Sequence, residues 1–238
     1  MRAGMMGAAF ALAAAAGATS AGAVTYDAFT SFNGTQLAGN FIYGEANPAT
    51  PNVSGTLFTA NTNCFIAGST CLQRAPNFDV PGVTKSTVTS FQYGSVNVPN
   101  DRLLAHPGND SNQTFLAFVA PTAGTYTVNA TFNIQDINPT GVGINLITTT
   151  MGGLPLIFSP LALINGANPT YSYSASFVLG QSEAVGFGLD NAGLYFNDST
   201  GVQFSVSMVP EPATWALLLI GFAVTGIAAR RRSCAVTA

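Results

Sequence analysis

Histidine and cysteine are the side chains of this sequence that most often serve in catalysis, and both are scarce. His106 is the single histidine among 238 residues, so a Ser-His-Asp or Cys-His arrangement would have to use it. The sequence contains no Gly-x-Ser-x-Gly nucleophile elbow. We therefore predict that the chain is not an enzyme. His106 then either contributes to a ligand site in an exposed loop or bonds to local backbone before Pro107 and Gly108.

Two pairs of aspartates would suit glycoside hydrolysis if the fold brought either pair together. Asp190 and Asp198 can approach across a hairpin, as can Asp101 and Asp110. Glycosidases hold two carboxyl groups about 5 to 9.5 Å apart around the scissile bond. Neither pair lies in a distinctive motif. A secreted carbohydrate-active enzyme therefore stays as the alternative to a non-catalytic protein.

Calcium binding is a second use for the same acids. Calcium takes oxygen ligands from carboxylates, Asn amides and loop carbonyls, and Asp190 and Asp198 flank a loop that contains Asn191 and Asn197. The EF-hand spacing is absent. The alternative is that Asp and Asn close turns by bonding to their own backbone. A structural calcium ion is the one cofactor that the sequence suggests.

Tyrosine rings provide chemistry for recognition, because they stack on sugar faces while their hydroxyl groups form hydrogen bonds. Tyr43, Tyr93 and Tyr195 are the candidates to line a glycan groove if they are exposed. His106 and Tyr195 are the candidate ligand-binding residues. The alternative for each tyrosine is packing in the core or on a strand face.

The cysteines indicate an oxidising compartment. Cys64 and Cys71 stand seven residues apart in a turn-rich segment, and we predict that they form a disulfide. A metal site is less favoured, because no second Cys or His cluster would complete a tetrahedral ligand set. Cys234 belongs to the C-terminal tail, where we expect it to be removed or to stay reduced.

Alternation with a period of two residues dominates the middle of the chain and predicts the elements that must position these groups. It is clearest over 126–134 and recurs over 171–177, 185–189 and 202–208. Strands with one polar face favour antiparallel pairing. Weaker strand candidates are 40–43, 56–59, 87–93, 103–105, 114–119 and 143–148, separated by turns rich in Pro and Gly. We predict an all-β fold of roughly ten strands, an antiparallel β-sandwich with jelly-roll-like connections.

Charge and end segments define the domain organisation. Arg2, an Ala-rich apolar stretch and Ala21-Gly22-Ala23 predict a signal peptide over 1–23, cleaved by signal peptidase. The ectodomain, 24–208, has nine acidic and three basic side chains, a formal net charge of −6. So few cations exclude a nucleic-acid partner.

The last thirty residues, 209–238, combine a short motif, an apolar stretch and a basic cluster. Pro210-Glu211-Pro212 precedes an apolar run over 213–229, which as a helix would span roughly 26 Å, close to the ~30 Å of a bilayer core. Arg230, Arg231 and Arg232 follow in the basic tail, 230–238, and favour a cytoplasmic C-terminus. We predict a single transmembrane helix stopped by these arginines.

This tail resembles the PEP-CTERM sorting signal. The resemblance implies recognition of Pro210, Glu211 and Pro212 by an exosortase, a membrane-embedded transpeptidase of Gram-negative bacteria that make exopolysaccharide. The ectodomain also resembles one that recurs in PEP-CTERM proteins, through Leu103–Gly108, Phe118–Val128 and Ala192–Gly201. That ectodomain is similar to carbohydrate-binding β-sandwich modules. The tryptophans usual there are missing, since the one Trp of this chain lies in the tail.

Together these features predict a protein of the cell envelope, exported across the inner membrane to the outer surface or extracellular matrix. Its expected role is non-catalytic, structural or glycan-associated, with exopolysaccharide as the expected ligand. Besides the carbohydrate-active enzyme, a further alternative is ice or surface adhesion through a Thr-rich face that contains Thr127 and Thr131.

Overall fold

The computed structural model describes residues 23–50, 55–61, 64, 66–74, 81–149, 155–210, 221–223 and 225. The chain divides into two units, Val24–Met208, called the ectodomain here, and Met1–Ala23 with Val209–Ala238. Residues 1–22 of the predicted signal peptide, Glu211, Pro212 and Arg230 to Arg232 lie outside the described residues. Within the predicted span 213–229, the described residues 221–223 and 225 are helical. Among the described residues, no helix is both long and apolar enough to cross a bilayer.

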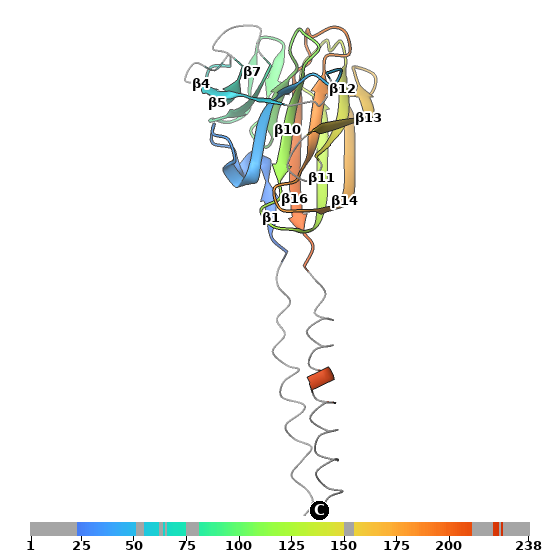
Figure 1. Ribbon diagram of the computed structural model, residues 1–238. Helices are drawn as coiled ribbons and strands as arrows, with labels where there is room; N and C mark the ends of the chain where they lie inside the picture. Colours follow the sequence, from blue (N-terminus) through green and yellow to red (C-terminus); the bar gives the residue numbers. More distant parts are fainter. Residues whose placement is uncertain are drawn as a thin grey trace, which may run out of the picture. The chain divides into compact units, whose positions relative to one another are not determined.

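The ectodomain is built almost entirely of strands (Figure 1). Its elements are β1 (Thr25–Asp27), α1 (Ala28–Ser31), η2 (Ala38–Asn40), β2 (Phe41–Ala46), β3 (Thr56–Leu57), β4 (Thr59–Asn61), β5 (Ser69–Gln73), β6 (Gly82–Ser86), β7 (Phe91–Tyr93), β8 (Val96–Val98), β9 (Leu103–His106), β10 (Gln113–Val119), β11 (Gly124–Ile134), β12 (Val142–Thr149), β13 (Leu156–Ile164), β14 (Thr170–Leu179), β15 (Ala184–Asp190) and β16 (Thr200–Met208). The predicted all-β fold is confirmed.

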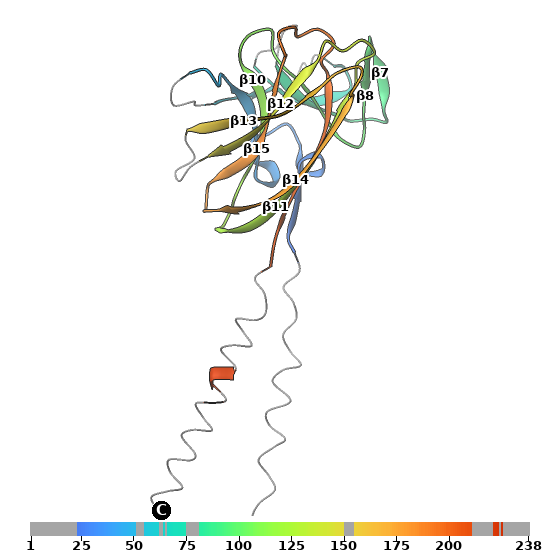
Figure 2. The same ribbon diagram turned by 90° about the vertical axis from the view of Figure 1, so that its right-hand side faces the viewer.

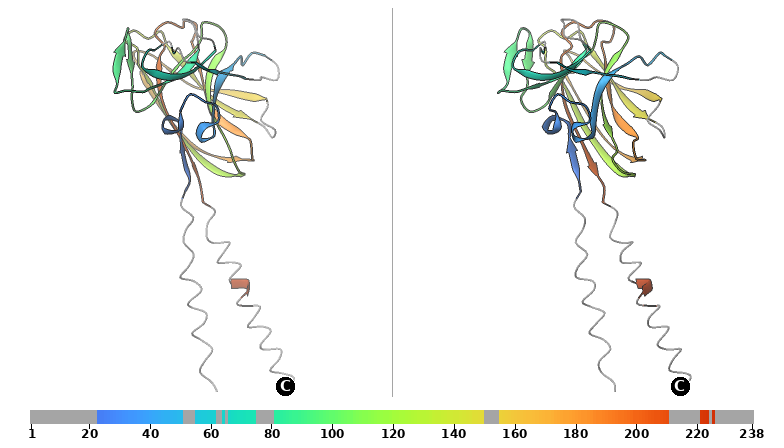
Figure 3. Two further views of the ribbon diagram at one scale, coloured as in Figure 1. Left: turned by 90° about the vertical axis from the view of Figure 1, so that its left-hand side faces the viewer. Right: turned by 60° about the vertical axis from the view of Figure 1, so that its left-hand side comes forward.

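Two antiparallel sheets form the layers of the sandwich. Sheet A has the order β14-β11-β16-β9-β6-β5-β4, with β1 also paired to β16, and sheet B has the order β13-β12-β15-β10-β2-β3. From β9 to β16 the chain crosses repeatedly between the sheets, so that β9-β16-β11-β14 faces β10-β15-β12-β13 in jelly-roll order. Figure 3 shows the β7–β8 hairpin, in green, beside these layers.

The alternating sequence of β11 explains its place in sheet A. Tyr126, Val128 and Phe132 are fully buried, whereas the polar residues between them face outward. β10 differs because all but its last residue are buried. Its Phe115 belongs to a second apolar cluster that covers the outer face of sheet B, while Phe118 belongs to the main core. A strand buried on both faces shows no alternation.

Aromatic rings fill the space between the sheets. Phe187 of sheet B packs edge-on against Phe132 and Phe204 of sheet A, with ring centroids 5.1 and 5.2 Å apart. Phe41 contacts Phe204 at 5.1 Å in the same manner. Edge-to-face contacts of this kind stabilise a core beyond simple area burial. They link the two sheets into one hydrophobic unit.

The first and last strands of the ectodomain lie side by side. Thr25 of β1 pairs with Ser207 of β16, so the first and last residues of the ectodomain lie next to each other (Figure 1). The other end of β16 begins at Thr200, next to β9. Nine extended residues place these two ends of β16 roughly 27 Å apart. Loops beside Thr200 therefore lie far from the point where the tail begins.

Candidate functional site

A cavity of about 230 Å³ lies on the outer face of sheet A, at the end of β16 that begins with Thr200. Val83, Leu103 and Ala105 of β6 and β9 belong to the core, so the alternate residues of these strands face the cavity. The lining residues are Ile66, Gln73, Gly82, Thr84, Val96, Leu104, His106, Pro107, Gly108, Asn109, Tyr195, Phe196, Asn197 and Ser199. Two of them, His106 and Tyr195, are the ligand-binding residues proposed from the sequence.

Three aligned residues form one row of the cavity floor. Gly82 of β6 pairs with Gln73 of β5 on one side and with His106 of β9 on the other. A Cβ atom at Gly82 would lie only 2.8 Å from Cγ of Gln73. Glycine therefore keeps the floor open between an amide and an imidazole.

His106 has a defined orientation. Its Nδ1 lies 2.6 Å from the carbonyl oxygen of Pro107, and its own carbonyl oxygen accepts a hydrogen bond from Thr114. Because a carbonyl oxygen only accepts, Nδ1 donates, and in the neutral ring Nε2 is the acceptor. The bond to local backbone is therefore present, whereas His106 lies at the end of β9 rather than in an exposed loop and lines a cavity there, so its role in a ligand site stays a prediction.

An aromatic pair stands beside the cavity. The rings of Tyr195 and Phe196 lie 4.2 Å apart between centroids with a 32° angle between their planes. Phe196 is 58% exposed, which is unusual for so large an apolar side chain. Thr140 Oγ1 lies 2.7 Å from the carbonyl oxygen of Leu194 and 2.9 Å from that of Phe196, so its single O–H is shared among nearby acceptors of this loop.

Asp198 connects the loop of Tyr195 and Phe196 to Thr140 and Gly141. Its carboxylate is fully buried and accepts hydrogen bonds from the Thr140 backbone N–H, the Thr140 hydroxyl and the Gly141 N–H. Burial raises the pKa of Asp198, and these donors, with His106 nearby, offset part of the rise. Its oxygen atoms are thus engaged by the protein itself.

The other aspartates that the sequence singled out bond to separate partners. Asp190 accepts from the Asn145 amide at 2.9 Å and from the Ala192 N–H at 2.9 Å. Asp101 forms an ion pair with Arg102 at 2.7 Å, and Asp110 forms one with Arg74 at 2.8 Å.

The partners of these aspartates bear on both a metal site and acid catalysis. Asp190 closes a turn with its own loop, which is the alternative role considered for it. Within the described residues, no three His, Cys, Asp or Glu side chains gather as a metal-binding group.

Arg74 braces the loop on one side of the cavity. Its guanidinium bonds to both carboxylate oxygens of Glu45 as well as to Asp110. These two acids raise the pKa of Arg74 against the opposing effect of burial. Asn191 donates to the carbonyl oxygen of Gly108 at 3.0 Å, which ties the same loop to the end of β15.

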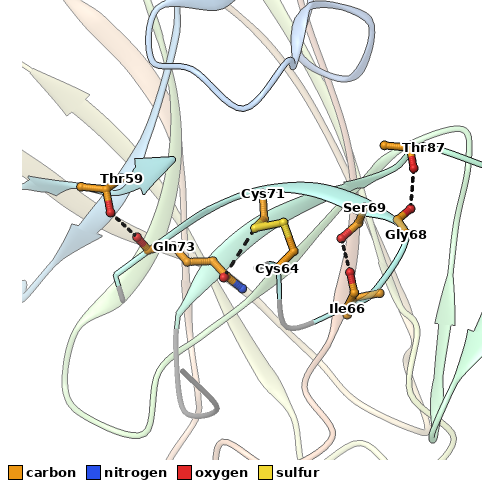
Figure 4. Close-up of a disulfide and its surroundings, with 8 residues drawn as sticks. All are labelled: Thr59, Cys64, Ile66, Gly68, Ser69, Cys71, Gln73 and Thr87. Atoms are coloured by element: carbon orange, nitrogen blue, oxygen red, sulfur yellow. Dashed lines mark hydrogen bonds between the residues drawn. A yellow bond between two sulfur atoms is a disulfide. The ribbon is translucent and has the colours of Figure 1, made fainter. Parts of the chain in front are cut away.

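A disulfide secures another wall of the cavity. Cys64 and Cys71 are bonded, with Cα atoms 5.7 Å apart (Figure 4). The Ser69 hydroxyl donates to the carbonyl oxygen of Ile66, and Thr87 donates to that of Gly68 at 2.7 Å. Figure 4 shows these contacts around the turn that carries Ile66 into the cavity wall.

Two tyrosines considered for a glycan groove have other positions. Tyr43 is fully buried and packs edge-on against Phe32, which is the alternative role in the core considered for it. Burial raises its pKa, with Asp27 adding a smaller effect. Tyr93 packs against the small cluster of Ile66, Val98 and Leu104. Alternation in a short strand does not distinguish these inward positions from outward ones.

Sequence analysis missed several residues of the cavity, among them Gln73, Gly82, Asn109 and Phe196. The adjacent aromatic residues Tyr195 and Phe196 inside a loop rich in Asn and Asp are a signal that could have revealed the aromatic wall. Gln73 and Gly82 gave no signal, because only strand pairing brings them beside His106.

Comparison with known families finds one match. The PEP-CTERM protein-sorting motif matches residues 209–232, which include Pro210, Glu211, Pro212 and the three arginines. The chain therefore carries the signal that an exosortase processes and that directs a protein to the cell surface. No curated protein matches the chain.

Three of the solved structures that are similar to this chain share little sequence identity with it. The crystal structure of murine APRIL at pH 8.0 shares 8% identity over 71% of this chain and 99% of that chain, with a TM-score of 0.28. The carbohydrate-binding module CBM6cm-2 of Cellvibrio mixtus lichenase 5A, in complex with cellotriose, shares 11% identity over 70% of this chain and 96% of that chain, with a TM-score of 0.24. PRD1 vertex protein P5 shares 9% identity over 71% of this chain and 96% of that chain, with a TM-score of 0.29. At TM-scores this low, the similarities carry no argument about ligand.

Proposed function

We propose that this PEP-CTERM-sorted chain is a non-catalytic protein of the outer surface or exopolysaccharide matrix, and that it binds a glycan in the cavity around His106 and Tyr195. The observation that carries the proposal is the pair of a half-buried Tyr195 and an exposed Phe196 beside uncharged polar groups. A sugar ring offers an apolar C–H face to such rings and hydroxyl groups to amides and imidazole. Asn109, Asn197 and His106 supply those polar partners.

The size of the cavity supports a small part of a polysaccharide as the ligand. Its volume of about 230 Å³ is less than the ~300–1,000 Å³ of pockets for drug-sized molecules. We take the bound unit to be one or two sugar rings, at a chain end or branch. The cavity also lies at the opposite end of β16 from Met208, where the tail begins.

The aspartates support the non-catalytic part of the proposal. Asp190, Asp198, Asp101 and Asp110 each bond to a different protein group. General acid catalysis needs a carboxyl group that can reach the leaving oxygen of the substrate. The Asp198 carboxylate is fully buried beneath its loop instead.

Co-sedimentation of the Val24–Met208 ectodomain with exopolysaccharide from the producing cells tests the proposal. Saturable binding is expected, with a loss of affinity of about tenfold or more in Tyr195→Ala and Phe196→Ala. Leu163→Ala is the matched control, since Leu163 of β13 is 55% exposed but lies outside the cavity. Equal binding by all three variants would reject the cavity as the site.

A reducing-sugar assay on the same mixtures tests the absence of catalysis. No release of sugar is expected over hours. Release that disappears in both Asp190→Asn and Asp198→Asn would instead establish the carbohydrate-active enzyme that the sequence left as an alternative.

A second candidate function, ice or surface adhesion, is favoured by the outer face of β11, β14 and β16. We call this surface the hydroxyl face: Thr127, Asn129, Thr131, Ser172, Ser174, Ser176, Gln203, Ser205 and Ser207. Cross-strand hydrogen bonds order its rows, as between Thr127 and Ser176 at 3.1 Å. Thermal hysteresis or adsorption to ice that vanishes in Thr127→Tyr would support this function. Activity that is absent in the unmodified ectodomain would reject it.

A further inference from the structure

The strand orders of the two sheets end in four edge strands that differ greatly in length and sequence, and β1, which pairs with β16 off this order, adds a further edge of three residues. β3 and β4 have two and three residues, respectively, which is too short to template another strand. β13 is longer, but it contains Pro160, and its pairing with β12 shifts register beside Asn145. Proline and irregular pairing both discourage the addition of a strand. Three of the four edges are therefore protected.

The fourth edge, β14, lacks every one of these protections. It is ten residues long, contains no charged residue, proline or glycine, and pairs with β11 without a register shift. No strand in the described part of the chain pairs with its other side, since β14 ends the order of sheet A. Its outward-facing residues Ser172, Ser174, Ser176 and Val178 are exposed. Figure 2 shows β14 beside β11 along one side of the sandwich.

We propose that β14 pairs with β14 of a second copy of this chain, antiparallel about a two-fold axis, so that sheet A continues across two molecules. Directly opposed residues of an antiparallel pair lie on the same face of a sheet. Every register that keeps the faces aligned therefore places Thr, Ser and Val against one another on the outer face. On the other face it places Tyr171, Tyr173, Ala175 and Phe177 against one another. The strand is complementary to itself.

A second copy fits this edge better than a different protein does, for two reasons. The strand has no charge that would repel an identical partner or attract an oppositely charged one. In addition, sorting by the tail gathers many identical chains at one surface, which raises their effective concentration. An edge contact alone is at the small end of protein interfaces, so the expected dissociation constant is on the order of micromolar or weaker.

A dimer formed through β14 would carry two glycan-binding cavities. This consequence rests on the proposed function. The cavity floor is built by β5, β6 and β9, which lie toward the opposite end of sheet A from β14 (Figure 1). Pairing through β14 therefore leaves both cavities open. Two linked sites bind a repetitive polymer with higher avidity than one site does.

Sedimentation equilibrium of the ectodomain over a wide concentration range tests the pairing itself, without any glycan. A mass that rises from monomer to dimer is expected. Ser172→Lys with Ser176→Lys should stay monomeric, because lysines would meet across the axis. Ser205→Lys with Ser207→Lys is the control, with the same charge and the same sheet face but on the interior strand β16, and should dimerise normally. A monomeric unmodified ectodomain at millimolar concentration, or edge lysines without effect, would overturn the proposal.

Cysteine cross-linking gives a second measurement that traps a weakly populated dimer. Ser174 lies near the middle of β14, so in the register that centres the two-fold axis on this residue, Ser174→Cys should form a disulfide-linked dimer under mild oxidation. Ser205→Cys, on the same face, should not. Circular dichroism melts confirm that each variant is folded. Because neither measurement includes a sugar, failure of the pairing is distinguishable from failure of glycan binding.

Discussion

The cavity and the hydroxyl face occupy the same outer side of sheet A and are both rich in uncharged polar groups, yet they use these groups differently. On the hydroxyl face, the Ser174 hydroxyl donates to Asn129 and the Thr127 hydroxyl bonds to Ser176. Around the cavity, loops bring aromatic rings, amides and an imidazole together in a hollow. On paired strands, neighbouring side chains satisfy one another's hydrogen bonds, whereas the loops around the cavity leave room for a ligand to do so. Composition alone does not separate the two regions.

The largest expected effect tests whether both regions rest on one core. Phe187→Ala should lower the free energy of unfolding by about 3–5 kcal/mol, because it removes a buried ring that contacts Phe132 and Phe204. Urea denaturation measures the loss. Phe196→Ala, which removes the same ring from an exposed position, should change stability by less than about 0.5 kcal/mol. Similar losses in the two variants would mean that the aromatic pair supports the fold rather than a site.

The disulfide should separate the cavity from the hydroxyl face. Cys64→Ser with Cys71→Ser should lower stability by about 2 kcal/mol, since the bond closes a short loop. Glycan affinity should also fall, because Ile66 of the cavity wall lies inside that loop. Hydrogen exchange of β11 and β14 should stay unchanged under native conditions. Retained affinity in this variant would show that the wall does not depend on the bond.

A buried hydroxyl offers a contrast with the paired hydroxyls of the sheet surface. The Tyr43 hydroxyl is buried and has no hydrogen-bond partner among the described residues. Tyr43→Phe should therefore raise the free energy of unfolding by about 1 kcal/mol, because it removes an unsatisfied polar group. Thermal or urea melts measure the gain. Destabilisation would mean that a water molecule or another group satisfies the hydroxyl in solution.

The smallest effect is expected on the hydroxyl face. Thr127→Val with Ser176→Ala removes both partners of one exposed hydrogen bond and should change stability by less than about 0.5 kcal/mol. Binding of exopolysaccharide in the co-sedimentation assay should be unaltered. A marked loss of binding would move the glycan site from the cavity to the sheet surface and end the distinction between the two regions.

Much of the fold could be predicted locally, and the exceptions have physical reasons. The alternation over 126–134 predicted β11, because one of its faces is buried and the other is polar. β13 was not predicted, because its sequence contains Pro160 and does not alternate between apolar and polar residues. β5 and β6 were missed as well, since each is short and flanked by turn residues. The candidate site was predicted only through His106 and Tyr195, the two members whose side chains suggest recognition by themselves.

The sequence by itself determined the sorting signal at 209–232, the all-β class and the antiparallel pairing, because each depends on composition or on a period within one segment. Only the tertiary structure decided that Gln73, His106 and Phe196 surround one cavity, that Asp190 and Asp198 bond to separate groups, and that β14 is the unprotected edge. These facts depend on which strands become neighbours. That order is set by packing across the whole sandwich, which no single segment of the chain encodes.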